Sequence, residues 1–276
     1  MQKGEYILVT GGAGSIGSEL VRQLVRENSV FILDINETAF FSLYEELREE
    51  ELNIHGMVGD VRRPETFETI KKRFGYPTTI YHAAALKHVT PSAWSPEDYV
   101  STNIVGTLNV LKFAELNELR VVNISTDKVV NATSIMGATK KVAEIATRDA
   151  GQVSVRFGNV LGSRGSVLEI WQRQIEQGRS LTVTDKKMMR FMMTIPEACE
   201  LVIKAGEIAE PGSIMVMDMG EKVNVLKLAQ DILHKSGKDK GIDMIGTRPG
   251  EAIQEEIMTP EEMTRAKKVD KFWIIT

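Results

Sequence analysis

A glycine-rich turn between an apolar strand and a helix is the feature that most constrains this chain. Tyr6–Thr10 has the pattern of a short buried strand, the run 11–17 (GGAGSIG) follows at once, and apolar residues then recur with helical period. A strand that passes through such a turn into a helix is the context of a dinucleotide-binding fingerprint. The glycines allow a tight turn, a close approach to a diphosphate and close packing of helix on strand, while the helix N-terminus holds the phosphates. The predicted cofactor-binding residues of this turn are Gly11, Gly14, Ser15, Ile16 and Gly17.

The second apolar segment, Val30–Asp34, ends in a carboxylate about 20 residues after the fingerprint. A carboxylate at this place accepts hydrogen bonds from the adenosine ribose hydroxyls and repels a 2′-phosphate. No arginine directly follows Asp34. The sequence therefore predicts NAD rather than NADP as cofactor.

Two further strand ends complete the predicted cofactor site. The third strand ends at Asp60 and Val61, where the aspartate can meet the adenine edge. A helix N-cap is the alternative for Asp60, and both roles can hold together. The fourth strand begins at Ile80 and runs into small residues that let the backbone approach the nicotinamide ribose, namely Ala83, Ala84 and Ala85.

Polar residues near the fourth strand differ in what they predict. His82 lies inside the apolar strand and is predicted to be a core histidine with satisfied hydrogen bonds rather than a catalytic residue. Lys87 and His88 lie just beyond the strand, on the side where ligands bind, and are better candidates for ligand contact. Asn103 is predicted to open the helix that runs to Leu116.

The strongest catalytic signal is the run Ser125-Thr126-Asp127-Lys128, which follows the apolar strand 120–124. A predicted helix after it carries Met136 and Lys140 four residues apart, and therefore on one face. Ligands of open α/β sheets bind at the carboxyl ends of the strands. The predicted catalytic residues at this place are Thr126, Asp127, Lys128, Met136 and Lys140.

Composition excludes several classes of protein. The net charge of 276 residues is -4 and no basic run is present, so no nucleic acid is expected as a partner. The single cysteine, Cys199, excludes an internal disulfide and a cysteine metal cluster, and is predicted to be a buried thiol. No apolar run approaches the roughly 20 residues of a membrane span. With a strand starting near residue 6 leaving no room for a signal peptide, a cytoplasmic protein without a metal is expected.

The order of elements predicts an α/β fold, with a Rossmann-like doubly wound parallel sheet and a small C-terminal substrate-binding lobe. Residues 1–160 are predicted to form the NAD-binding Rossmann domain. Residues 161–276 are predicted to form the lobe, with segments that return to the sheet. Ile214–Met217 is predicted to be the last strand of that sheet.

The chain resembles the extended short-chain dehydrogenases/reductases, and among them the nucleotide-sugar 4,6-dehydratases of bacterial polysaccharide and glycan biosynthesis. The segments that carry the resemblance cover nearly the whole chain: TGGAGSIGS, LDINE, AAALKHV, TNIVGTLNV, ISTDKVVNATSIMGATK, VRFGNVLGSRGSV, RFMMTIPEA and GTRPGEAIQEE. The resemblance implies UDP-N-acetylglucosamine as substrate and a 4-keto-6-deoxy sugar as product. Self-association into a homo-oligomer is also expected from it.

The resemblance also assigns roles. Oxidation at sugar C4 by NAD acidifies the C5 proton, Lys128 matches the base that removes it, and Asp127 matches the acid that helps the C6 hydroxyl leave. The alternative is that these two residues only pair with each other. Lys140 matches a cofactor-binding position as well as a catalytic one. The implied substrate-binding residues, together with Lys87, are Asn159, Arg164, Arg190, Arg248 and Glu251, with a solvated loop as the alternative for Arg190.

Met136 departs from the superfamily, which mostly has a tyrosine there that takes the C4 hydroxyl proton. Methionine cannot accept it, and Thr126, Asp127 or a water leading to Lys140 remain open routes. Relatives with methionine tend to retain the configuration at C5, so the retaining product is expected. Two other functions remain: a UDP-sugar 4-epimerase, which needs no acid and base at C5 and C6, and a non-catalytic NAD-binding sensor.

Overall fold

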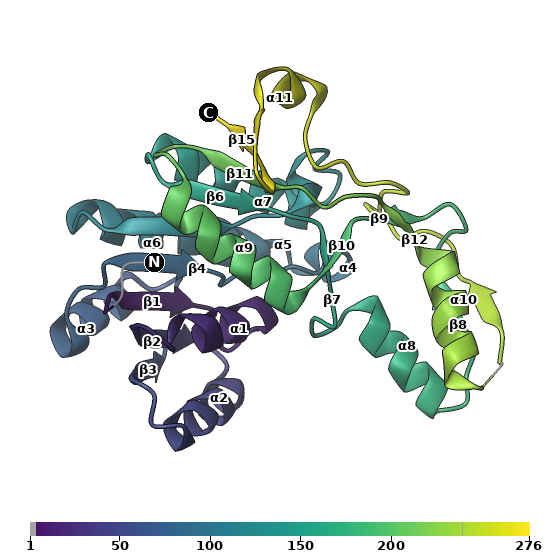
Figure 1. Cartoon of the computed structure of the whole chain (residues 1–276), viewed down its shortest axis with the longest axis horizontal. Coiled ribbons are helices and arrows are strands. Elements are labelled where there is room, and N and C mark those ends of the chain that lie inside the picture. The colour runs from purple at the N-terminus through teal and green to yellow at the C-terminus, as the bar shows by residue number, and fades with distance from the viewer. Residues whose placement is uncertain (1–3, 239) are drawn as a thin grey trace.

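The computed structural model describes residues 4–238 and 240–276. Within them, nine strands form one sheet that is parallel except at one edge (Figure 1). This confirms the predicted α/β fold with a Rossmann-like sheet. In spatial order the strands are β14 (Lys267–Val269), β15 (Phe272–Ile275), β11 (Ile214–Met217), β6 (Val153–Arg156), β5 (Arg120–Ile124), β4 (Thr79–His82), β1 (Tyr6–Thr10), β2 (Ser29–Asp34) and β3 (Ile54–Val58).

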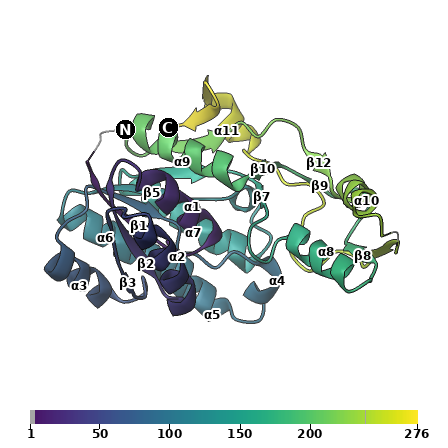
Figure 2. The same ribbon diagram turned by 60° about the horizontal axis from the view of Figure 1, so that its bottom comes forward.

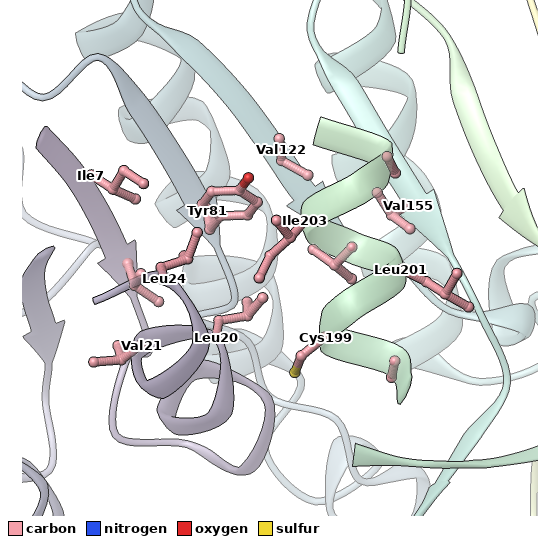
Figure 3. Packing of buried hydrophobic residues seen from close by; sticks show 14 of the residues in the cluster. Ile7, Leu20, Val21, Leu24, Tyr81, Val122, Val155, Cys199, Leu201 and Ile203 are labelled. Carbon is pink, nitrogen blue, oxygen red and sulfur yellow. The ribbon is translucent and has the colours of Figure 1, made fainter. Parts of the chain in front are cut away.

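Helices cover both faces of the sheet, so its central strands are apolar almost throughout. On one face lie α1 (Ser15–Leu24), α2 (Glu37–Glu49) and α9 (Ile195–Ile208). On the other lie α3 (Pro64–Phe74) and α6 (Gly106–Leu116), with α7 (Ile135–Asp149) packed beside α6. Figure 3 shows Leu20 of α1 and Cys199 of α9 in the core between these helices and the sheet. Cys199 has no exposed surface, which confirms the prediction of a buried thiol.

His82 is the core histidine that the sequence predicts. Its side chain is 1% exposed, with Nδ1 2.7 Å from Thr10 Oγ1 and Nε2 3.0 Å from Thr107 Oγ1. Burial, with a smaller effect of the Lys140 charge, lowers the pKa of His82 to about 3. The ring is therefore neutral and its two nitrogens tie β1 and α6 to β4.

The helix around Asn103 begins earlier than predicted. Short helices α4 (Val89–Ser92) and α5 (Pro96–Tyr99) come first, and a π-helical segment, Val100–Val105, leads into α6. Asn103 lies inside that segment and is 1% exposed. Its side chain exchanges two hydrogen bonds with the backbone of Leu86 and donates a third to Thr139 Oγ1. The prediction that Asn103 opens a helix was therefore wrong. Its side chain instead fixes the segment after β4 to α7.

The prediction that β11 is the last strand of the sheet was also wrong. β15 pairs antiparallel with β11, and β14 pairs antiparallel with β15. A helix of six residues, α11 (Pro260–Arg265), comes before these strands. Trp273 and its neighbours thus extend the sheet edge, which no local periodicity indicated.

A 3-10 helix of three residues, Asp127–Val129, follows β5, and the other remaining elements lie beyond the carboxyl ends of the strands (Figure 2). They are β7 (Asn159–Leu161), α8 (Val167–Glu176), β8 (Leu181–Val183), β9 (Met189–Arg190), β10 (Met192–Thr194), β12 (Val223–Asn224), α10 (Val225–Ser236) and β13 (Ile242–Met244). A separate apolar cluster around Trp171 and Met188 holds α8 and α10 together. In the part of the chain that the structure describes, no helix is long and apolar enough to cross a membrane.

Candidate active site

The glycine turn has the geometry that a dinucleotide site requires. Gly11 has φ of 64°, and a Cβ there would lie 2.6 Å from the Ala84 nitrogen. A Cβ at Gly17 would lie 2.0 Å from the Gly11 oxygen, so helix and turn can approach this closely only with glycine. Gly14 is the N-cap of α1, whose first-turn N–H groups have no partner within the helix. The turn therefore fits a bound diphosphate.

Asp34 lies at the end of β2 against this turn and is 9% exposed. Its Oδ2 accepts a hydrogen bond from the Ala13 nitrogen at 2.9 Å, and its Oδ1 accepts one from the Asn36 nitrogen at 2.8 Å. The carboxylate is thus fixed beside the glycine turn, where a ribose-binding acid belongs in this kind of fold.

Asp60 lies two residues beyond β3 and accepts hydrogen bonds from the backbone and side chain of Arg62. Burial acts to raise the pKa of Asp60, but these hydrogen bonds and the arginine charge outweigh burial and lower the pKa. The N-cap of α3 is Arg63, so the interpretation of Asp60 as a simple helix cap was wrong.

A cleft of about 710 Å³ runs from the glycine turn to β7 and β10. The predicted site residues that line it are Gly11, Gly14, Ser15, Ile16, Gly17, Ala83, Ala85, Lys87, His88, Thr126, Lys128, Met136, Lys140, Asn159 and Arg164. The lining does not include Asp34, Asp60, Val61, Ala84, Asp127, Arg190, Arg248 or Glu251. Residues at the cleft that the sequence analysis missed include Asn36, Tyr99 and Gly158.

Asp127 and Lys128 form a hydrogen-bonded ion pair at the end of β5. Lys128 Nζ donates to Asp127 Oδ1 at 2.8 Å and to Asn159 Oδ1 at 2.9 Å. Thr126 Oγ1 donates to the same Asp127 oxygen at 3.0 Å. Asp127 has no exposed surface, and its Oδ2 is buried without a hydrogen-bond partner among the described residues. A buried oxygen without a hydrogen bond lowers the stability of the fold, so a functional role explains Asp127 better than a structural one.

A third ionisable group near this pair, Glu255, was missed by the sequence analysis. It is 6% exposed, and burial raises its pKa, with the charge of Lys128 acting against the shift and that of Asp127 adding to it. The bridge between Met189 and Gln254 fixes the adjacent backbone. Glu255 lies in a polar segment that has neither strand nor helix period. Its position near Asp127 and Lys128 therefore follows from the folded structure and not from a local sequence pattern.

Met136 and Lys140 lie on one face of α7, as predicted, and both line the cleft. Lys140 Nζ donates to the Ile124 carbonyl oxygen. Burial lowers the pKa of Lys140 to about 8, although Glu144, one turn further along the helix, acts to raise it. A buried lysine of this kind is neutral in part near neutral pH and can accept a proton.

A second set of buried charges lies directly behind this site. The guanidinium of Arg156 on β6 bonds the carboxylates of Glu144 and Glu262, and Ser125 Oγ donates to Glu144 Oε2 at 2.6 Å. Arg156 is 2% exposed. The network joins the end of β5 to α7 and to the capping box of α11.

The predicted substrate-binding arginines occupy three different environments. Arg190 is 6% exposed and its guanidinium donates to the carbonyls of residues 189, 252 and 253, so the solvated-loop interpretation was wrong. Arg248 is exposed, and its backbone nitrogen donates to Glu251 Oε2 at 3.1 Å. Arg164 reaches across to the glycine turn. Their roles in substrate binding stay predictions.

The sheet, the glycine turn and the cleft at its carboxyl edge define the class of the extended short-chain dehydrogenases/reductases. A family model described as polysaccharide biosynthesis protein matches residues 7–276, and the chain belongs to this family.

Three known proteins illustrate the similarity. The probable polysaccharide biosynthesis protein EpsC of Bacillus subtilis is 42% identical in an alignment of 276 positions that covers 95% of this chain and 46% of EpsC. A UDP-glucose 4-epimerase of Rickettsia bellii is 34% identical over 98% of the chain and 82% of that protein. The X-ray structure of Pen from Bacillus thuringiensis superposes with a TM-score of 0.93 at 34% identity, covering 99% and 88% of the two chains. The chain thus spans about half the length of EpsC.

Proposed function

We propose that this chain is an NAD-dependent 4,6-dehydratase that converts UDP-N-acetylglucosamine to a UDP-4-keto-6-deoxy sugar for polysaccharide biosynthesis. The observation that carries the proposal is the hydrogen-bonded pair of Asp127 and Lys128 at the cleft end of β5. The family description and the name of EpsC support the polysaccharide context. The name of the Rickettsia relative supports a UDP-sugar as substrate.

The residues of the glycine turn and Asp34 would hold the adenosine and diphosphate of the cofactor, with Ala83, Ala85 and Lys140 at its nicotinamide end. When bound, the nicotinamide supplies the acceptor and donor of the hydride that leaves C4 and returns to C6. The buried carboxylate of Asp34 favours NAD, since a 2′-phosphate would meet a negative charge.

The pair supplies both proton transfers of the elimination. A proton shift along the 2.8 Å hydrogen bond from Lys128 to Asp127 turns the ion pair into a neutral amine and a carboxylic acid. Lys128 then takes the C5 proton, and the proton of Asp127 goes to the departing C6 hydroxyl, which leaves as water. The products of the elimination are an ammonium and a carboxylate, which is the starting ion pair. As the hydride returns to C6, the ammonium of Lys128 gives a proton back to C5. The proton taken from the C4 hydroxyl balances the one lost with the departing water, so the protein ends the cycle with the protons it began with.

Thr126 connects the buried acid to the cleft. Asp127 has no exposed surface, whereas Thr126 lines the cleft and its hydroxyl contacts Asp127 Oδ1. The proton from Asp127 therefore passes through this hydroxyl, which gives up its own proton as it receives another. At C4, where Met136 cannot accept a proton, the partly neutral Lys140 takes it.

Incubation with UDP-N-acetylglucosamine and NAD in deuterated water tests this function. NMR should find a 4-keto-6-deoxy sugar with deuterium at C5, and we expect retained configuration there. A product epimerised at C4 without exchange at C5 would favour the UDP-sugar 4-epimerase, the second candidate, which the name of the Rickettsia relative supports. Absence of turnover by protein that binds NAD would favour the sensor.

A further inference from the structure

The turn formed by residues 162–166, here called the strap, crosses from β7 to the glycine turn. The backbone N–H of Arg164 donates to Ser15 Oγ at 2.9 Å, and its guanidinium donates to the Ala13 carbonyl. These contacts join segments that are 149 and 151 residues apart in the chain. Both sides of the cleft are therefore linked at the glycine turn, where the diphosphate is predicted to bind.

The strap is also fixed at its far side. Gly165 has φ of 70°, and a Cβ there would lie 2.6 Å from His88 Cε1. Its N–H donates to the carboxylate of Glu169. A residue with a side chain could not take this conformation without moving the histidine ring. Contacts on two sides make the strap a closed bridge and not a free loop.

The strap brings positive charge and an unpaired hydroxyl to the cleft. Burial lowers the pKa of Lys87, and the charge of Arg164 lowers it further, against an opposing effect of Glu169. Two cations thus share this part of the cleft with the N-terminus of α1. Ser166 Oγ is buried without a hydrogen-bond partner among the described residues and belongs to the cleft lining. This combination suits an anion with several oxygens, such as a diphosphate.

We propose that the strap retains the dinucleotide through Arg164, so that one cofactor molecule stays bound from hydride removal to hydride return. The inference rests on the proposed function, in which a hydride taken from C4 must return to C6 of the same sugar. A cofactor that left in its reduced form would strand the oxidised sugar. This proposal gives Arg164 a role in cofactor retention, whereas the family resemblance implies a role in substrate binding.

Release of NADH tests the strap without any sugar. Protein loaded with NADH is mixed with excess NAD, and the loss of bound-NADH fluorescence gives the dissociation rate. Arg164→Ala should accelerate release at least tenfold, and Arg164→Lys should do so less because it keeps the charge but loses the fork. Gly165→Ala should also accelerate release, although it keeps every charge. Arg173→Ala, which changes an exposed arginine of α8, is the matched control and should have no effect.

An unchanged release rate in Arg164→Ala and in Gly165→Ala would overturn the strap. So would a variant Arg164→Ala that raises only the KM for the nucleotide sugar, because the arginine would then serve the substrate. If the two strap variants release NADH faster but the unmodified chain does not turn over the sugar, the strap proposal holds and the dehydratase proposal is rejected. If the unmodified chain turns over the sugar but the variants release NADH at an unchanged rate, the dehydratase proposal holds and the strap proposal is rejected.

Discussion

Two sets of buried charges lie at the ends of neighbouring strands, and only one of them is fully satisfied. The guanidinium of Arg156 makes five hydrogen bonds, four of them to Glu144 and Glu262, which equals its number of N–H groups. Asp127, bonded to Lys128, keeps one buried oxygen without a partner among the described residues. A complete set of hydrogen bonds holds elements together, whereas an incomplete one beside a cleft leaves a group available for proton transfer.

Glu144 links the Arg156 set to residues beside the Asp127–Lys128 pair. This carboxylate bonds both Arg156 and Ser125, and its charge raises the pKa of Lys140 against the effect of burial. Glu262 and Glu144 also raise the pKa of Arg156, although burial acts against them. Changes in the satisfied set should therefore affect stability first, and the proposed chemistry only through Lys140.

The largest effect is expected from Asp127→Asn. An amide keeps a hydrogen bond to Lys128 but cannot deliver the proton, so kcat should fall by about 10³ to 10⁴. The free energy of unfolding should fall by less than in Arg156→Met, because the volume is unchanged and the Lys128 side chain, 21% exposed, still reaches water. Steady-state kinetics and denaturant unfolding measure the two quantities, with exposed Asp149→Asn as the control. Near-normal turnover in Asp127→Asn would remove the acid from this site.

Arg156→Met should have the opposite profile. It leaves Glu144 and Glu262 buried without their cation, which costs about 3–5 kcal/mol of unfolding free energy. The partly exposed arginine in Arg148→Met should cost at most about 1 kcal/mol, because its ion pair lies at the surface. Equal stability losses in both variants, read from urea unfolding curves, would erase the distinction between the two sets of charges.

The pH profile of kcat/KM should separate the sets further. Lys140 must be neutral to accept a proton, and its pKa is about 8, so activity should rise about tenfold per pH unit below that value. The ionisable groups that act on Lys140 are Glu144 on its own helix and His82 on β4, and His82 stays neutral with a pKa of about 3. Glu144→Gln should move the rise to lower pH. An unchanged pH profile of kcat/KM in Glu144→Gln would show that the charges around Arg156 do not influence catalysis.

The smallest effect is expected from Asp34→Ala. Asp34 resembles the Arg156 set because its oxygens have hydrogen-bond partners, and it resembles the Asp127–Lys128 pair because it is expected to bind a ligand. This buried carboxylate already accepts two backbone N–H groups, yet it should also bind ribose. We expect weaker NAD binding and a loss of about tenfold in preference for NAD over NADP, which is about 1.4 kcal/mol. Titration with both cofactors measures it. An unchanged ratio would assign Asp34 to structure alone.

Local patterns predicted most of what is regular in this fold. The strands around the glycine turn, the shared face of Met136 and Lys140, and the core position of His82 follow from period and from small residues. The roles of the site residues and the boundary near residue 160 stay predictions. What failed depends on contacts distant in sequence, which have no period.

Three residues illustrate those distant contacts. Asn103 bonds a segment 17 residues earlier and a helix 36 residues later, so a local pattern cannot distinguish it from a helix cap. The guanidinium of Arg190 donates hydrogen bonds to backbone carbonyls more than 60 residues away in the sequence. Glu255 becomes part of the site only when the turn that carries it packs against β9.

The five hydrogen bonds of Arg156 also constrain how this chain can change over generations. Its partners Glu144 and Glu262 lie 12 and 106 residues away, so a change at one position leaves buried charge at the other two. Single replacements should be lost through destabilisation, whereas joint replacement by apolar residues of similar volume can be tolerated. Among related sequences these three positions should therefore vary together. Sequence changes in α11, which carries Glu262, should accompany changes in β6 and α7, which carry Arg156 and Glu144.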